Sequence, residues 1–205
     1  MSTLLVIAKE PRPGRVKTRL TPPFTPEEAA ALAEAALRDT LHAVLAAPAR
    51  RRVLVLDGVP GPWLPPGFDV VPQCAGGLDE RLAGAFGGCD GPALLIGMDT
   101  PQVTPALLTV DWRGTDAYFG PAEDGGFWAL GLAEPDPELL RGVPMSTAGT
   151  GALQRGRLVA AGLRVRDLPR LRDVDTAHDA EVVAAGAPHG RFAAELARLT
   201  AVAGR

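Results

Sequence analysis

The feature that most constrains the fold is a set of short, almost wholly apolar runs separated by helix-like segments. The runs are Thr3–Ile7, Arg52–Leu56 and Pro92–Gly97. Strands that are apolar at successive positions are typical of a parallel sheet that is buried on both faces. Between the first two runs, a capping box at Thr25–Glu28 begins an Ala-rich helix that ends before Pro48. This order predicts an α/β protein with a parallel-rich sheet covered by helices on both faces.

The rest of the chain continues this alternation, with denser strands and more glycine in the second half. An antiparallel excursion is therefore expected there, within one domain over residues 1–205. Further strands are expected at 68–71, 116–119, 127–132 and 163–168, and helices at 78–86, near 104–105, at 152–161, at 177–185 and at 191–203.

Composition excludes several classes of protein. The net charge of −3 gives no overall field that favours nucleic acid or an anionic membrane. Cys74 and Cys89 are far apart, which argues against a disulfide framework and a cysteine-type zinc site. No apolar run approaches the roughly 18 residues of a membrane span, and the first residues do not resemble a signal peptide. A cytoplasmic protein is the expectation.

A basic loop follows the first apolar run, and Pro11, Pro13 and Gly14 prevent a regular helix in it. Such a loop at the carboxyl end of a parallel strand is suited to anionic ligands, phosphate above all. Neither the P-loop nor the dinucleotide-binding glycine pattern is present, so side chains would do most of the binding. A solvated loop without a ligand is the alternative. The loop cations are Lys9, Arg12, Arg15, Lys17 and Arg19.

Acidic residues stand at the ends of three expected strands. Asp99 follows an apolar run, Glu123 and Asp124 precede the pair Gly125-Gly126, and Asp173 and Asp175 follow the strand at 163–168. Each has a structural alternative: a turn for Asp99, a tight hairpin for the Asp-Gly pair, and a helix cap at Thr176 for the last group. Taken together they predict a site for Mg²⁺ or Mn²⁺, which prefer oxygen ligands. The ion would bridge the carboxylates and a phosphorylated donor, while Lys17 and Arg19 neutralise the remaining phosphate charge.

Four motifs in this order resemble one bacterial family. They are Lys9-x-Pro11-x-Pro13-Gly14-x-x-Lys17-Thr18-Arg19-Leu20, Gly97-Met98-Asp99-Thr100-Pro101, Gly120-Pro121-Ala122-x-Asp124-Gly125-Gly126-Phe127 and Arg172-Asp173-Val174-Asp175-Thr176. The family is DUF2064, also labelled selenodomain-associated transferase 1. It resembles the nucleotide-diphospho-sugar transferase superfamily, which implies a GT-A-type three-layer α/β/α sandwich with a mostly parallel mixed sheet.

The resemblance also implies roles for individual residues. Lys17 and Arg19 would contact the donor phosphates, in the loop that also holds Lys9 and Gly14. Asp99 would hold the metal, with Asp175 favoured over Asp173 as the second ligand. The segment Gln73–Arg81 would line the nucleotide side, which makes Glu80 and Arg81 candidates together with Gly125 and Gly126. The chain departs from the family at Met98 and Thr100, where Ser and Cys are common, and at Met145, where Trp is common, so the acceptor side is expected to differ.

Three functions are weighed. The first is a metal-dependent glycosyltransferase that uses a nucleotide-sugar, with Asp124 or Glu123 as the base for an acceptor hydroxyl and Lys17 neutralising the leaving phosphate. The second is a guanylyltransferase-like nucleotidyltransferase that joins an NTP to a phosphorylated acceptor and releases pyrophosphate. The third is a non-catalytic nucleotide-binding module. The expected partners are a nucleotide or nucleotide-sugar donor and a small-molecule acceptor, while the base, the sugar and homodimer formation stay open.

Overall fold

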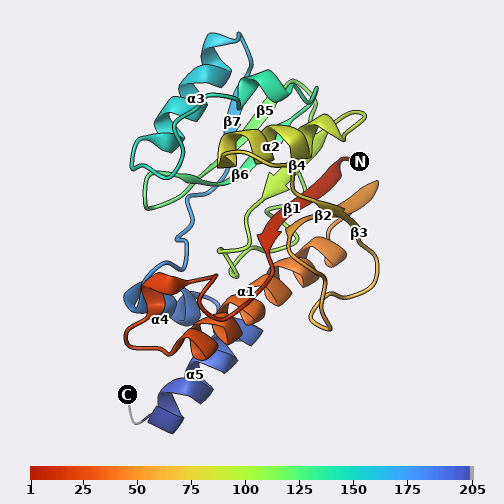
Figure 1. Cartoon of the computed structure of the whole chain (residues 1–205). Helices are drawn as coiled ribbons and strands as arrows, with labels where there is room; N and C mark the ends of the chain where they lie inside the picture. Colours follow the sequence, from red (N-terminus) through yellow and green to blue (C-terminus); the bar gives the residue numbers. More distant parts are fainter. Residues whose placement is uncertain (204–205) are drawn as a thin grey trace.

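The computed structural model describes residues 1–203, so the last two residues of the expected 1–205 domain lie outside the described part. Seven strands form one sheet in the order β3-β2-β1-β4-β6-β5-β7 (Figure 1). Strand β6 runs antiparallel to both of its neighbours, and every other pair is parallel. The expected mostly parallel sheet with an antiparallel excursion in the second half is confirmed. The strands are β1 (Thr3–Lys9), β2 (Arg51–Asp57), β3 (Asp69–Pro72), β4 (Ala93–Ile96), β5 (Ala117–Pro121), β6 (Phe127–Leu132) and β7 (Val165–Asp167).

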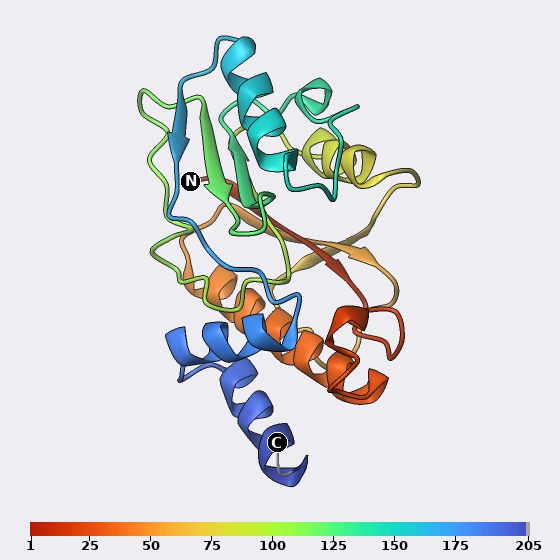
Figure 2. The same cartoon turned by 90° about the vertical axis from the view of Figure 1, so that its left-hand side faces the viewer.

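Helices cover both faces of this sheet. Figures 1 and 2 show α2 (Leu78–Gly87) and α3 (Thr150–Ala160) on one face. On the other face lies α1 (Pro26–Ala46), against which α5 (Arg191–Ala203) packs, and α4 (Ala177–Gly186) packs against α5. This is the three-layer α/β/α arrangement of the GT-A-type fold.

The apolar runs supply side chains to both layers, because successive residues of a strand point to opposite faces. Leu4 and Val6 of β1 belong to the core on the α1 side, together with Leu41. Leu5 of the same strand belongs to the core on the other face, together with Phe86 of α2. All five side chains are essentially inaccessible to solvent. Both faces of the strand are therefore buried, which is why successive residues in this run are all apolar.

A third core joins the carboxyl-terminal helices to the start of the chain. Leu20 of the short 3₁₀ helix η1 (Thr18–Leu20) and Phe24 pack with Leu32 of α1, Val183 of α4 and Phe192 of α5. The two capping boxes that open α1 and α4 form as the sequence indicates, at Thr25 with Glu28 and at Thr176 with Asp179. The contacts of Leu20, Phe24 and Thr25 fix the chain directly after the basic loop.

Three short segments differ from expectation. The helix expected near 104–105 does not form. The amides of Leu107 and Leu108 donate to the carbonyls of Thr104 and Pro105, which makes successive turns that do not continue into a helix. The 3₁₀ helix η2 (Pro137–Leu139) was not expected, and neither was η1 at the end of the basic loop. The signal for η2 is Asp136, whose side chain accepts from the Glu138 amide in front of a proline at the first helical position.

The topology brings three loops to one edge of the sheet. Strands β1 and β4 are parallel neighbours, so the basic loop after β1 and Asp99 after β4 leave the sheet side by side. Because β6 is antiparallel to β4, the loop that precedes β6 reaches this same edge. Residues 1–203 contain no helix that is both long and apolar enough to cross a membrane.

Candidate functional site

The basic loop is anchored on both sides of Lys17. Val16 is 6% exposed and packs into the core on the α1 side, while Leu20 is fully buried in the third core. Lys17 itself has a φ of 49°, in the left-handed region that residues other than glycine seldom adopt. Such a conformation persists only where the surroundings impose it. The loop therefore directs the Lys17 side chain inward instead of leaving it in solvent.

The acidic residues converge through a backbone hydrogen bond. The amide of Val174, in the segment between β7 and α4, donates to the carbonyl of Asp99 at 2.9 Å. Val174 is 1% exposed, so its side chain faces the core. Asp173 and Asp175, the residues before and after this buried valine, are partly exposed, and the hydrogen bond holds their segment beside Asp99.

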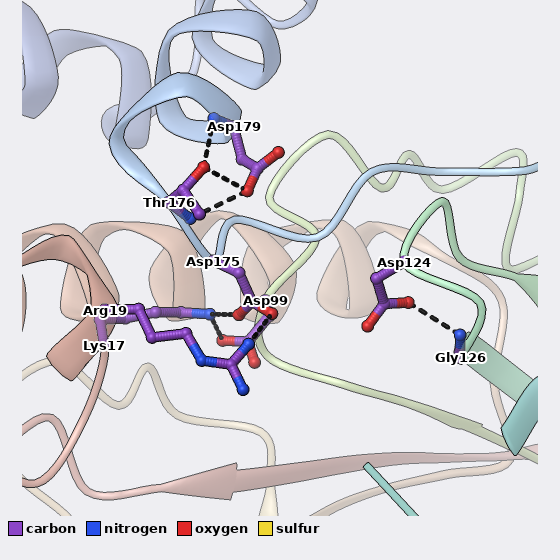
Figure 3. A network of polar contacts seen from close by, with 8 residues as sticks. All are labelled: Lys17, Arg19, Asp99, Asp124, Gly126, Asp175, Thr176 and Asp179. Atoms are coloured by element: carbon purple, nitrogen blue, oxygen red, sulfur yellow. Dashed lines mark hydrogen bonds and ion pairs between the residues drawn. The ribbon is translucent and has the colours of Figure 1, made fainter. Parts of the chain in front are cut away.

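Lys17 lies between two of these carboxylates. Its Nζ is 2.7 Å from Oδ1 of Asp99 and 3.4 Å from Oδ1 of Asp175 (Figure 3). Arg19 reaches the other oxygen of Asp175 at 3.2 Å. The Lys17 side chain is only 7% exposed, whereas those of Asp99 and Asp175 are 42% and 34% exposed. Both carboxylates thus face solvent while sharing one cationic group.

A cleft of about 640 Å³ opens over this cluster. One wall is the basic loop, another is the start of α2 with the residues before it, and a third is the segment that leads into α3. Nine of the residues singled out from the sequence line it: Lys9, Lys17, Arg19, Arg81, Asp99, Asp124, Gly126, Asp173 and Asp175.

The electrostatics of the cluster are dominated by its buried members. Burial would lower the pKa of Lys17, but the carboxylates of Asp99 and Asp175 outweigh this and hold the pKa above its usual value. The ammonium is therefore charged at neutral pH. Burial raises the pKa of Asp173 to about 7, and the neighbouring carboxylates of Asp99, Asp124 and Asp175 act in the same direction against the opposing charge of Lys17.

The loop before β6 separates two adjacent acids. Asp124 lines the cleft, and its Oδ1 accepts from the Gly126 amide at 2.8 Å (Figure 3). Glu123 does not line the cleft, because its carboxylate forms an ion pair with Arg172. The structure therefore places only Asp124 where a cleft ligand could be reached.

Gly125 also lies outside the cleft lining and has a packing role. Its φ is 89°, its carbonyl accepts from the Gly151 amide at 2.8 Å, and a Cβ there would lie 2.1 Å from the Ala148 carbonyl oxygen. The glycine lets two chain segments approach closely, rather than letting a ligand approach.

Gly125→Ala is expected to destabilise the fold by at least about 2 kcal/mol, because the left-handed strain and the clash add. Gly142→Ala is the matched control. Gly142 has a φ of 73° with nothing within 4 Å of its Cβ position, so this variant has the cost of the left-handed backbone without a clash. Urea unfolding of the two variants measures the difference. Equal losses of stability would show that the close approach to Ala148 has no energetic weight.

Two further candidates, Gly14 and Glu80, do not line the cleft. Gly14 has a φ of 73° and no neighbour at its Cβ position, which is the geometry of an exposed turn. Glu80 accepts from the Gly77 amide at 3.2 Å and so caps α2. Arg81, by contrast, lines the cleft while its Nε donates to the Gly76 carbonyl and its Nη1 lies 3.5 Å from Asp57.

The cleft also contains Arg15 and Ser146, which the sequence did not single out as site residues, and Gln73, the first residue of the segment expected on the nucleotide side. Arg15 lines it and, like Lys9, has no ion-pair partner within residues 1–203. Gln73 lines it from the end of β3 and donates to the carbonyls of Ala8 and Val55. Ser146 lines it with a φ of 59°. Gln73 was found through the resemblance of its segment, and Arg15 could have been found as a cation of the basic loop, whereas a left-handed serine has no sequence signature.

The donor set suits a divalent cation that keeps other ligands. Asp99 and Asp175 already direct oxygens at one positive group, as a hard cation requires. In the described chain, no three histidine, cysteine or acidic side chains are grouped closely enough to hold an ion by themselves. Mg²⁺ and Mn²⁺ fit such a site, since Mg²⁺ is commonly held by one or two carboxylates together with phosphate oxygens and water.

The fold is that of the nucleotide-diphospho-sugar transferase type of architecture, and the cleft lies at the carboxyl ends of β1 and β4. The chain belongs to the DUF2064 family, described as an uncharacterized protein conserved in bacteria, whose model matches residues 31–147. The matched region contains the Asp99 and Asp124 motifs. The basic loop and the Asp173–Asp175 segment lie on either side of it.

Solved structures share the architecture. A protein from Desulfovibrio desulfuricans G20, named provisionally as a nucleotide-diphospho-sugar transferase, superposes with a TM-score of 0.87 at 26% identity, covering 98% of this chain and 96% of that one. CMP:2-keto-3-deoxy-manno-octonic acid synthetase complexed with CTP has a TM-score of 0.57 at 12% identity, with coverage of 92% and 99%. Rv0371c from Mycobacterium tuberculosis H37Rv in complex with manganese has a TM-score of 0.52 at 23% identity, with coverage of 88% and 96%. No curated protein matches the chain significantly.

Proposed function

We propose that this chain is a metal-dependent transferase that uses a nucleotide-activated donor, and that the group transferred is a sugar from a nucleotide-sugar. The observation that carries the proposal is the convergence of Asp99 and Asp175 on one cationic group, in a cleft that is also lined by Lys9 and Arg15, two cations without an ion-pair partner among residues 1–203. A cleft with both features suits a ligand that is anionic and carries a cation with it. The pyrophosphate of a nucleotide donor with Mg²⁺ or Mn²⁺ is such a ligand.

The residues divide between the two parts of this ligand. Asp99 and Asp175 would hold the metal, which when bound stabilises charge on the phosphate oxygens as a Lewis acid. Lys9, Arg15 and Arg19 would contact the phosphates, because they line the same cleft beside the carboxylates. The complexes of proteins of this fold with manganese and with CTP are consistent with this assignment.

Asp124 is the proposed general base. Its Oδ1 is held by the Gly126 amide in the cleft wall, whereas Glu123 is engaged by Arg172. The acceptor hydroxyl would give its proton to Asp124 and attack the anomeric carbon of the sugar. The bond from that carbon to the phosphate oxygen then breaks, and a nucleoside diphosphate leaves with its charge stabilised by the loop cations.

A nucleotidyltransferase is the second candidate, favoured by the density of cations. Four of them, Lys9, Arg15, Lys17 and Arg19, line one cleft, which suits a triphosphate. An acceptor phosphate would attack the α-phosphorus of the NTP, and pyrophosphate would leave. Such an acceptor is already nucleophilic, so this reaction has no need of Asp124 as a base.

A thermal-shift screen of NTPs and nucleotide-sugars, each with and without Mn²⁺, tests the proposal. A donor at 100 times its dissociation constant is expected to stabilise the protein by about 2.7 kcal/mol, and only when Mn²⁺ is present. Incubating the best donor with candidate acceptors then separates the two reactions, because one releases a nucleoside diphosphate and the other pyrophosphate. The absence of a metal-dependent shift with any nucleotide would contradict the proposal.

A further inference from the structure

The Nζ of Lys17 lies between the two carboxylates that are proposed to hold the metal. Its Nζ is within 3.4 Å of both Asp99 and Asp175, and its side chain is far less exposed than theirs. An ammonium in this place balances the charge of two carboxylates that would otherwise repel each other. A divalent ion that binds the same oxygens has to displace it.

The loop holds the ammonium there through its backbone. Lys17 has a left-handed φ, and buried residues flank it at Val16 and Leu20. A solvated lysine on a mobile loop would be free to leave, whereas this side chain is directed into the cluster by the fold. Within residues 1–203, the 74% exposed side chain of Arg19 forms an ion pair with Asp175 alone. Lys17 is therefore the group in direct competition with a metal.

We propose that Lys17 is a tethered competitor of the divalent ion, which keeps the carboxylates occupied until a metal and a phosphorylated donor arrive together. The inference rests on the proposed function, because it concerns the same site. With metal alone, displacement leaves the ammonium without a partner in a largely buried place, so binding is weak. With a nucleotide present, the displaced ammonium finds phosphate oxygens, so metal and nucleotide bind with positive coupling.

The consequence for the enzyme is protection of the site from free metal. A metal that binds without a donor would be held unproductively, whereas coupled binding makes the complete metal–donor complex the preferred ligand. By linkage, the nucleotide strengthens Mn²⁺ binding by the same factor by which Mn²⁺ strengthens nucleotide binding. Removal of the ammonium is expected to reduce that factor.

Mn²⁺ titration followed by electron paramagnetic resonance tests this on the full chain without nucleotide. Lys17→Met is expected to bind Mn²⁺ at least about tenfold more tightly than the wild type, because two carboxylates lose their internal cation. Arg12→Met is the matched control: it removes one positive charge from the same loop, where Arg12 pairs with Glu10 at 3.1 Å outside the cleft lining. An Mn²⁺ affinity of Lys17→Met equal to or below that of the wild type would overturn the proposal.

A second measurement uses the wild-type protein, so it does not depend on the variant folding. The chain has only two lysines, Lys9 and Lys17, and Lys9 is exposed. Under amine acetylation read by mass spectrometry, Lys9 is expected to react throughout and Lys17 only once Mn²⁺ is bound. A Lys17 that stays protected at saturating Mn²⁺ would overturn the inference while leaving metal binding intact. Failure of Mn²⁺ to bind even with nucleotide would overturn the proposed function as well.

Discussion

Asp99→Asn is expected to reduce the Mn²⁺-dependent affinity for the donor nucleotide by about 100-fold or more, which corresponds to about 2.7 kcal/mol. The substitution keeps the shape of the side chain and removes the charge that lies 2.7 Å from Lys17 Nζ. A neutral amide is a poor ligand for a hard divalent cation compared with a carboxylate. Isothermal titration with nucleotide and Mn²⁺ measures the loss.

Asp111→Asn is the control for this experiment. Asp111 pairs with Arg113 at 2.8 Å on the surface and does not line the cleft, so its variant is expected to bind as the wild type does. Thermal unfolding of Asp99→Asn separates binding from folding, because Lys17 keeps Asp175 as a partner in the variant. A collapse of stability together with unchanged metal affinity would make Asp99 a structural residue.

The raised pKa of Asp173 leads us to expect that the metal-free protein becomes less stable as pH rises toward neutrality. Its pKa is about 7 in the folded state against a usual value of 3.8, so between these values the folded chain holds a proton that the unfolded chain releases. The free energy of unfolding is therefore expected to fall as pH rises from about 4 to about 7, and to level off above. The contribution lost is up to about 4 kcal/mol, at about 1.4 kcal/mol per pKa unit.

Asp173→Asn removes this titration. In the presence of a chelator, the variant is expected to be more stable than the wild type at pH 8 and about equally stable at pH 4. The carboxylates of Asp111 and Asp116 have pKa values of about 2, so most of their contribution is lost below about pH 4, and it is the same in the variant and the wild type. Urea unfolding across pH 4–8 measures the profiles, and parallel profiles for the variant and the wild type would contradict the assignment to Asp173.

Much of the fold was predictable because its signals are local or periodic. The apolar run at 3–7 predicted a strand buried on both faces, and Leu4 and Leu5 do face opposite cores. The capping box at Thr25 predicted the start of α1, which is confirmed. The segment near 104–105 was misjudged because a threonine–proline pair opens a turn as readily as a helix, and only the chain beyond it decides which one forms.

The sequence indicated which loops would form the site, but not which side chains would contact each other within it. Strand ends indicated that the basic loop and Asp99 would meet, since parallel neighbours share an edge. The preference for Asp175 over Asp173 as a metal ligand stays a prediction. The structure adds that the Val174 amide bonds to the Asp99 carbonyl and that Asp175 pairs with Lys17. Nothing in the sequence indicated that Arg172 would engage Glu123, because that ion pair depends on two segments that meet only in the folded chain.

The most direct test of the account is the position of a bound ion. Crystals grown with Mn²⁺ and the donor nucleotide identified by the thermal-shift screen would locate Mn²⁺ through its anomalous scattering. We expect one peak within coordination distance of the Asp99 and Asp175 carboxylates and of a donor phosphate, with Lys17 Nζ moved onto the phosphate. A nucleotide bound in the cleft with no ion at these carboxylates, and with Lys17 still between them, would contradict the account.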